Sequence, residues 1–302
     1  MFIDPAILNT LRHICYFTQE VVDLKIVNVN LPVTSYEDLV ALIVNAITPK
    51  TRLAVFDHIT SATGFVLPIA ELIAACHARD VPVLVDGAHG PGQLPLNLNT
   101  LQADFYVANC YKWLFSAKSV AFLHVNKSFQ ATTRPVVTSL AYEQGFVEEF
   151  SMQGTLDECN YFTLPTAIDF FQSLGAERIY AYNTSLITWA SNYLSTVWGT
   201  ETLLPLGQRA PFMAAIRIPW EFPTNSNEDD MHVICDRICD LLYDNWKCVA
   251  KLCPFQGRLY VRISAQIYNE RQDYIRLAEA VTHLLLQPNI SLSTELGKLD
   301  IH

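Results

Sequence analysis

The chain has 302 residues, enough for one large domain or two ordinary ones, and its 51% hydrophobic and 17% charged residues exclude wholesale disorder. A formal net charge of -10 and a pI of about 5.2 make nucleic acid and anionic membranes poor partners. We see no secretion signal at the start and no apolar run that could span a bilayer. Eight scattered cysteines are therefore interpreted as reduced thiols of a cytoplasmic protein. Cys235 and Cys239 lack partners at zinc-site spacing, so we predict no metal site.

Helix-like and strand-like segments alternate from residue 37 to about residue 125. Their hydrophobic periodicity predicts helices at residues 37–46 and 68–79. Short apolar runs predict strands at residues 52–57, 81–86, 104–108 and 120–125. The last of these follows so closely that we expect an antiparallel return. The pattern predicts an α/β layer with a mostly parallel sheet.

The pattern of predicted helices and strands changes in the second half of the chain. A polar loop is expected around residues 143–160, before helices at residues 162–174 and 178–197. Further on, we predict strands at residues 214–218, 249–253 and 259–263, and helices at residues 229–245 and 271–286. We therefore divide the chain into a large domain, residues 1–182, and a smaller α+β domain, residues 183–302. The tail from Pro288 is expected to be loosely held.

Polar residues follow three predicted strands of the first half, at residues 58–64, 86–89 and 109–112. Each segment alone is a weak signal. Asp86 alone suits a helix cap or turn, Lys112 a surface position, and His89 a structural role. Ligands bind outside the carboxyl ends of the strands in open α/β sheets, so three such segments on one sheet edge favour a binding site.

An aspartate and a lysine at successive strand ends suit pyridoxal phosphate (PLP). Lys112 can hold the cofactor aldehyde as an imine and later carry a proton at the substrate α-carbon, which makes it the predicted catalytic residue. Asp86 can keep the pyridine nitrogen protonated. His89, the second predicted catalytic residue, can reach the ring oxygen or stack on the ring, while Asn109 and Tyr111 can bind the phosphate.

An amino-acid substrate also needs a cation for its carboxylate, and Arg262 fits. It lies on a predicted strand whose neighbours Val261 and Ile263 should face the core. A guanidinium binds a carboxylate through two parallel hydrogen bonds. The alternative interpretation of Arg262 is a structural ion pair.

Three motifs together carry a resemblance: Asp57-His-Ile-Thr-Ser-Ala-Thr-Gly64, Asp86-Gly-Ala-His89 with Lys112, and Tyr260-Val-Arg-Ile-Ser264 followed by Tyr268-Asn269. They resemble the class V aminotransferase-fold PLP enzymes, in particular the isopenicillin-N-epimerase-like branch that includes cysteine desulfhydrases. The resemblance runs from about residue 20 to residue 285. It implies the aspartate-aminotransferase-like fold of fold type I, with a seven-stranded mixed sheet and a small C-terminal domain. It also implies a homodimer with its sites at the subunit interface.

The resemblance gives each matching residue an implied role. Asp86 would pair with the pyridine nitrogen, and Lys112 would carry the cofactor. His89 and Ser61 would contact the ring oxygen. Two more positions follow the same pattern: Asn109 as a phosphate-binding residue, and Arg262 as the carboxylate-binding arginine. Thr155, in Gly154-Thr155, resembles the residue that reaches the phosphate from the partner subunit.

The chain departs from the family pattern at three places. Tyr111 stands where a histidine is usual. Ala117-Lys118-Ser119 replaces Pro-Lys-Gly, so we expect a displaced loop there. The opening segment of the family, with a phosphate-binding turn and a stacking aromatic, has no counterpart in residues 1–36, where Asn9-Thr10 is the nearest candidate. The large domain is therefore expected to be incomplete at its N-terminus.

These features give two functional hypotheses. The first is a PLP-dependent carbon–sulfur lyase acting on cysteine or a derivative, with epimerase and aminotransferase activities sharing the same early steps. A cysteine desulfurase is disfavoured because Cys248 and Cys253 are interpreted as buried strand thiols. The second is a catalytically inactive truncated homologue or a non-catalytic dimer partner. Three aromatic residues can line a substrate pocket, although core packing is the preferred interpretation of each: Tyr268, Phe212 and Trp220.

Overall fold

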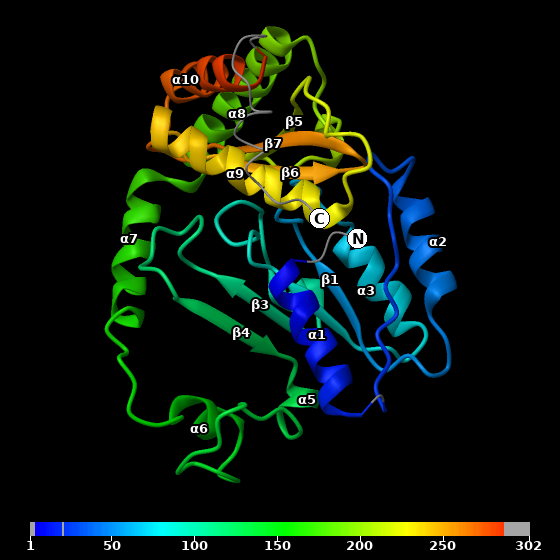
Figure 1. The fold of residues 1–302 in the computed structure, drawn as a ribbon. Helices are drawn as coiled ribbons and strands as arrows, with labels where there is room; N and C mark the ends of the chain where they lie inside the picture. Colours follow the sequence, from blue (N-terminus) through cyan, green and yellow to red (C-terminus); the bar gives the residue numbers. More distant parts are fainter. Residues whose placement is uncertain (1–3, 20, 287–302) are drawn as a thin grey trace.

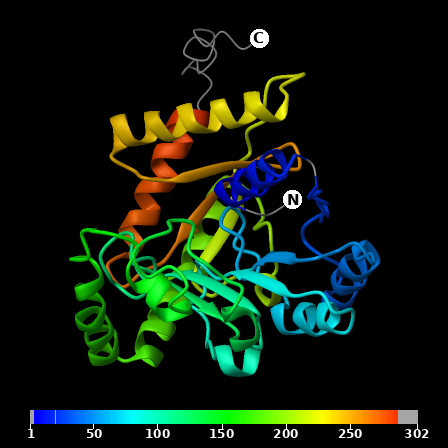
Figure 2. The same ribbon diagram turned by 90° about the horizontal axis from the view of Figure 1, so that it is seen from below.

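The computed structural model describes residues 4–19 and 21–286 of the chain. Figure 1 shows two layered parts, one around a four-stranded sheet and one around a three-stranded sheet. Helices flank both sheets, and the view from below in Figure 2 shows the same two parts side by side. None of the helices in the described ranges is long and apolar enough to cross a membrane.

The first sheet has the order β1-β2-β3-β4. Its strands are β1 (Ala54–Asp57), β2 (Val83–Asp86), β3 (Phe105–Asn109) and β4 (Ala121–Val125). The first three are parallel, and β4 returns antiparallel to β3, which confirms the prediction of a mostly parallel sheet. The resemblance implied seven strands, but the described residues form four in this sheet. Before α2, the described residues 4–19 and 21–35 contribute a helix and irregular segments that pair with no strand.

The sheet is covered by α3 (Ile69–His77), which was predicted at residues 68–79. Apolar residues recur at helical spacing on α3, so they form one buried face of the helix. This face packs against the inward side chains of β2 and β3 in one hydrophobic core. The predicted helix at 37–46 is α2 (Tyr36–Ala46), which packs against α3. The Ser35 side chain caps it by accepting from Asp38 N at 3.0 Å.

A helix that we did not predict, α1 (Pro5–Phe17), crosses in front of the sheet in the view of Figure 1. The Asp4 side chain caps it by accepting from Ala6 N at 2.9 Å. Asn9-Thr10 lies inside this helix, and Thr10 Oγ1 donates to the Ala6 carbonyl. The nearest candidate for a phosphate-binding turn is thus a helix interior, where the backbone N–H groups are already bonded.

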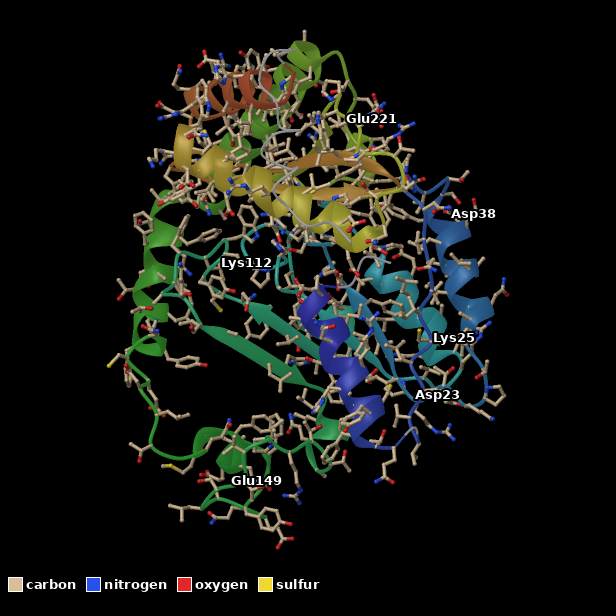
Figure 3. All side chains as sticks on the ribbon, in the orientation of Figure 1. Asp23, Lys25, Asp38, Lys112, Glu149 and Glu221 are labelled. Atoms are coloured by element: carbon tan, nitrogen blue, oxygen red, sulfur yellow. The ribbon has the colours of Figure 1, made fainter. Side chains whose placement is uncertain are left out.

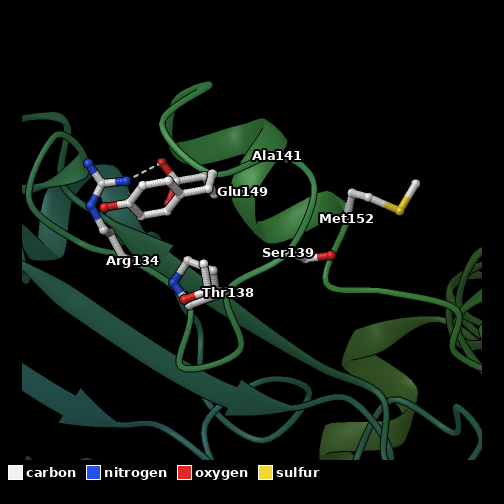
Figure 4. Close-up of a pocket in the computed structure, with 8 residues that line it drawn as sticks. Arg134, Thr138, Ser139, Ala141, Glu149 and Met152 are labelled. Atoms are coloured by element: carbon white, nitrogen blue, oxygen red, sulfur yellow. Dashed lines mark hydrogen bonds and ion pairs between the residues drawn. The ribbon is translucent and has the colours of Figure 1, made fainter.

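A short helix, α4 (Leu98–Leu101), precedes β3. Four helical elements connect β4 to the second part of the chain: α5 (Lys127–Gln130), α6 (Phe146–Ser151), a 3-10 turn (Tyr161–Thr163) and α7 (Leu164–Leu174). The predicted loop at 143–160 was partly wrong, because α6 interrupts it. Arg134 forms an ion pair with the buried Glu149 of α6 beside a recess of about 20 Å³ (Figure 4), room for no more than a water molecule.

The second sheet has the antiparallel order β5-β7-β6. Its strands are β5 (Met213–Arg217), β6 (Lys251–Phe255) and β7 (Arg258–Ser264), and its helices are α8 (Ala176–Trp198), α9 (Glu228–Trp246), α10 (Arg271–Val281) and a last turn (Thr282–Leu286). A 3-10 turn (Leu206–Gln208) precedes β5. The largest core cluster of the described residues lies between these helices and strands.

Strand β6 begins at Lys251, two residues later than the strand predicted at 249–253. The delay arises at the end of α9, where Lys247 adopts a left-handed conformation and Cys248 N donates to Leu242 O. Helix α8 runs unbroken through the predicted domain boundary at 182/183, which stays a prediction. The tail from Pro288 lies outside the described residues.

Candidate active site

A cavity of about 370 Å³ opens between the carboxyl edge of the first sheet and strand β7. Four predicted site residues line it: Ser61, His89, Lys112 and Arg262. The remaining lining residues are Trp113 and members of the segment 264–269. Figure 3 shows Lys112 at the junction of the two parts of the molecule. Ser61 and Arg262, which are 201 positions apart in the chain, are thus brought into one cavity.

The centre of this cavity is the contact between Lys112 Nζ and His89 Nε2, at 3.1 Å. Burial lowers the pKa of His89 to about 3, with the charges of Lys112 and Arg262 adding to the effect. The imidazole is therefore neutral, and one of its nitrogens can accept from the lysine, which has only donors when charged. Burial also lowers the pKa of Lys112, and Asp86 opposes this shift. A lysine with a lowered pKa is a better nucleophile near neutral pH.

Asp86 ends β2 and is 9% exposed. Its Oδ1 accepts from Ala88 N at 2.9 Å, which is the turn role that the residue alone suggested. Burial raises the pKa of Asp86, whereas the Ala88 N–H and the charge of Lys112 lower it. The carboxyl group is therefore held in place and coupled electrostatically to Lys112, although it does not line the cavity.

A tyrosine beneath the turn explains why its glycines are needed. A Cβ on Gly87 would lie 2.1 Å from ring atoms of Tyr106, and one on Gly90 would lie 2.4 Å from the Tyr106 hydroxyl. Tyr106 is fully buried, and its hydroxyl lies 2.9 Å from His58 Nδ1. Burial lowers the pKa of His58 to about 4, so this histidine is neutral as well. Sequence reasoning gave neither Tyr106 nor His58 a role, because their contacts join residues 48 positions apart.

Arg262 lies on β7 between Val261 and Ile263, which are both buried in the core as predicted. Its Nη1 donates to the Ser61 carbonyl at 2.8 Å, and its Nε has no partner among the described residues. Within the described ranges no carboxylate forms an ion pair with it, so the interpretation as a structural ion pair has no support. The guanidinium is fixed at the cavity with donors left to bind an anion.

The other predicted cofactor residues lie away from the cavity wall. Asn109 ends β3 and pairs with Ala121, and Tyr111 is half-buried in the turn that follows. Thr155 is exposed on the connection between α6 and α7. Their roles stay predictions. Ser119, at the position of the family glycine, adopts a φ of 75°, so the turn keeps a glycine-like conformation without glycine.

The three aromatic residues considered for a substrate pocket differ in exposure. The packing interpretation was wrong for Tyr268, which is 78% exposed and lines the cavity. It was right for Phe212, which is 1% exposed and packs on Trp113, and for Trp220, which packs against the core of the second part. Cys253 is buried in β6, and burial raises the pKa of its thiol to about 11.

Cys248, the other thiol weighed as a nucleophile, is only half-buried and precedes β6, so the prediction of a strand thiol was wrong for it. Burial raises the pKa of its thiol as well. No group of histidine, cysteine or carboxylate side chains in the described part of the chain can hold a metal ion.

Comparison with known proteins identifies the family and the fold. The model of the family described as "Aminotransferase class-V" matches residues 6–276. The chain belongs to this family. An L-cysteine desulfhydrase of Arabidopsis thaliana is 30% identical over 78% of this chain and 54% of its own length. The isopenicillin N epimerase of Streptomyces clavuligerus is 29% identical over 82% of this chain and 64% of its own length. The chain thus spans between about half and two thirds of these relatives.

The solved structures show the fold. The cystine C–S lyase C-DES, in complex with its product cysteine persulfide, has a TM-score of 0.68 and 21% identity, and covers 93% of this chain and 73% of its own. A variant of C-DES has glycine covalently linked to its PLP cofactor. The predicted fold class and the predicted family branch are confirmed.

Proposed function

We propose that this chain carries the cofactor lysine and the substrate-binding arginine of a PLP-dependent enzyme that acts on an amino acid. The observation that carries the proposal is the shared cavity of Lys112, His89 and Arg262. A half-buried lysine beside a neutral imidazole, a guanidinium with an unused Nε donor and a fixed aspartate behind them fit the aldehyde, a substrate carboxylate and the pyridine ring.

PLP, when bound, supplies an electron-withdrawing ring that makes the α-proton of an amino acid acidic. Each residue of the chain then has a distinct task. Arg262 binds the substrate carboxylate and orients the α-carbon. Lys112 Nζ would hold the cofactor and, when released, would accept the α-proton of the substrate. Asp86 would pair with the pyridine nitrogen, and the neutral His89 accepts a hydrogen bond from Lys112.

The reaction that we propose is cleavage of the Cβ–S bond of cysteine or an S-substituted cysteine. The L-cysteine desulfhydrase relative and the C-DES neighbour support this assignment. Loss of the α-proton and of the sulfur leaving group gives a three-carbon product that water converts to pyruvate and ammonia. The isopenicillin N epimerase relative favours epimerisation as the second candidate, in which the proton returns to the opposite face of the α-carbon. Product analysis distinguishes the two activities. The lyase releases pyruvate together with sulfide from cysteine or a thiol from an S-substituted cysteine, whereas the epimerase gives a D-amino acid.

The assembly that we propose is a homodimer in which Thr155 reaches the phosphate of the partner's cofactor. Thr155 is exposed here, and so are apolar side chains near it, among them Leu156 and Phe162. Eight free cysteines agree with a reducing compartment such as the cytoplasm. Sedimentation of the chain with PLP tests the dimer, and Thr155→Ala should weaken PLP binding only if a dimer forms.

Covalent trapping tests the proposal directly. The chain is mixed with PLP, reduced with borohydride and digested, and the peptide that contains Lys112 is analysed by mass spectrometry. We expect a pyridoxyl group on Lys112 and its loss in Lys112→Ala. Lys118→Ala is the matched control, because Lys118 is an exposed lysine six positions away. A pyridoxyl group that survives in Lys112→Ala refutes the assignment, and no trapping at all favours an inactive homologue or a non-catalytic partner.

A further inference from the structure

Two aspartates lie side by side at the ends of the parallel strands β1 and β2. Asp57 and Asp86 are register partners in the pairing of these strands. Paired residues point to the same face of a sheet, and neighbouring strands lie about 4.8 Å apart. Both side chains are buried, Asp57 being 6% and Asp86 9% exposed. Two buried carboxyl groups therefore lie next to each other behind the cavity.

The two carboxyl groups have unequal hydrogen bonds. Asp86 Oδ1 accepts from the backbone N–H of Ala88 at 2.9 Å. Asp57 Oδ1 is buried, and no donor in the described part of the chain reaches it. A buried carboxylate without a donor is costly, whereas a protonated carboxyl group is neutral. The structure therefore accommodates a negative charge better on Asp86 than on Asp57.

The surrounding charges act in the same direction. Burial raises the pKa of Asp57 to about 8, and the negative charges of Asp86 and Asp4 add to this effect, while Lys112 opposes it. For Asp86, burial also raises the pKa, but the N–H of Ala88 and the charge of Lys112 lower it, and Asp4 raises it. Two neighbouring carboxyl groups do not both ionise readily, so one of them keeps a proton.

We propose that Asp57 is a positioning residue that keeps its proton at neutral pH, so that Asp86 is the single negative charge of the pair. The inference rests on the proposed function, in which Asp86 pairs with the pyridine nitrogen of PLP. One fixed carboxylate gives that nitrogen a defined partner. A second ionised carboxyl group beside it would repel Asp86 and change its orientation. Asp57 acts through Asp86 and does not line the cavity.

Infrared spectroscopy of the chain without PLP tests where the proton lies. A protonated carboxyl group absorbs apart from a carboxylate, so difference spectra between wild type and Asp57→Asn report the proton directly. At pH 6.5 we expect the protonated-carboxyl band to disappear in Asp57→Asn, and in wild type to titrate away as the pH rises through about 8. Asp104→Asn is the matched control, because Asp104 is buried but accepts from His77 and from Val83 N. A band that remains in Asp57→Asn overturns the proposal.

A second readout connects the proton to the cofactor. Asp57→Asn keeps a neutral side chain of similar shape, so we expect it to bind PLP at pH 7 with a dissociation constant within about threefold of wild type. The absorbance of bound PLP should change near pH 8 in wild type and not in the variant. A variant that still shows this step overturns the proposal. If neither protein binds PLP, the proposed function fails, and the infrared band alone decides where the proton lies.

Discussion

Replacement of Gly87 by alanine tests whether the turn after β2 is held rigidly against Tyr106. Gly87 does not have a positive φ, so alanine is allowed by the backbone and the conflict is steric alone. A Cβ would lie 2.1 Å from two ring carbons of Tyr106. The Tyr106 ring is fully buried and stacks on Phe122 with centroids 6.2 Å apart, and its hydroxyl is hydrogen-bonded to His58. Because these contacts hold the ring, we expect the backbone of the turn to shift instead.

The size of the effect follows from the contact distance. Carbon atoms pack at about 3.5–4.0 Å, so ring and methyl group must separate by roughly 1.4 Å or more. Overpacking of a rigid core costs about 1–3 kcal/mol, and we expect Gly87→Ala to lower the free energy of unfolding by roughly 3 kcal/mol. The same displacement carries Asp86 and His89 away from Lys112. Denaturant unfolding measures the first effect, and borohydride trapping of PLP measures the second.

Three further variants make the test specific. Gly207→Ala, with no atom within 4 Å of its Cβ, should change the unfolding free energy by less than about 0.5 kcal/mol. In Gly90→Ala the closest contact is with the Tyr106 hydroxyl at 2.4 Å and the next is with the Gly87 carbonyl at 3.2 Å, so Tyr106→Phe should relieve most of the conflict. At Gly87 the ring carbons clash, so Tyr106→Phe should not help. A Gly87→Ala protein as stable as wild type, or equal rescue at both positions, would refute the reasoning.

Three other predictions follow from the site. Arg262→Ala should weaken binding of a cysteine analogue to the PLP-loaded chain by about 2–5 kcal/mol, measured by titration of the cofactor absorbance, and unchanged affinity would exclude its role. Burial lowers the pKa of His58 to about 4 in the folded protein, so below pH 6.5 the unfolded state takes up a proton that the folded state does not. The free energy of unfolding should therefore fall by about 3 kcal/mol as the pH is lowered from above 6.5 to 4. His58→Gln should lack that loss in urea unfolding measured at several pH values. Cys253→Ala should leave sulfide release from cysteine unchanged, because its buried thiol stays protonated; abolished release would indicate a desulfurase.

The sequence predicted the first sheet because its strands are unusually apolar. Continuous Val and Leu residues in β2 indicated a strand buried on both faces, and the short distance to β4 indicated its antiparallel return. The helices α1 and α6 were missed for different reasons. Helix α1 carries an N-cap aspartate followed by proline, a start signal that was present but not used. Helix α6 has six residues, too few for a periodic pattern.

The site was predictable in its principal residues and not in its supporting ones. Lys112, His89 and Arg262 are unusual residues at strand ends or within an apolar strand, and sheet topology alone places the first two at one edge. Asp57 is also at a strand end, but its importance depends on its pairing with Asp86, which is a property of register rather than of local sequence. Register is decided by the packing of the whole sheet, and a local pattern does not contain it.

The electrostatics of this edge argue that it is more than a scaffold. Asp57, Asp86, His58, His89 and Lys112 all have pKa values displaced toward their neutral forms, with burial as the first cause in each. Burial of so many ionisable groups opposes folding, and apolar residues of similar size would pack there at lower cost. Ionisable groups with pKa values shifted in this way beside an open cavity are suited to gain, lose and transfer protons when a charged ligand enters. The concentration of these groups at three strand ends therefore fits the α-proton chemistry that we propose, and a purely structural sheet edge does not require it.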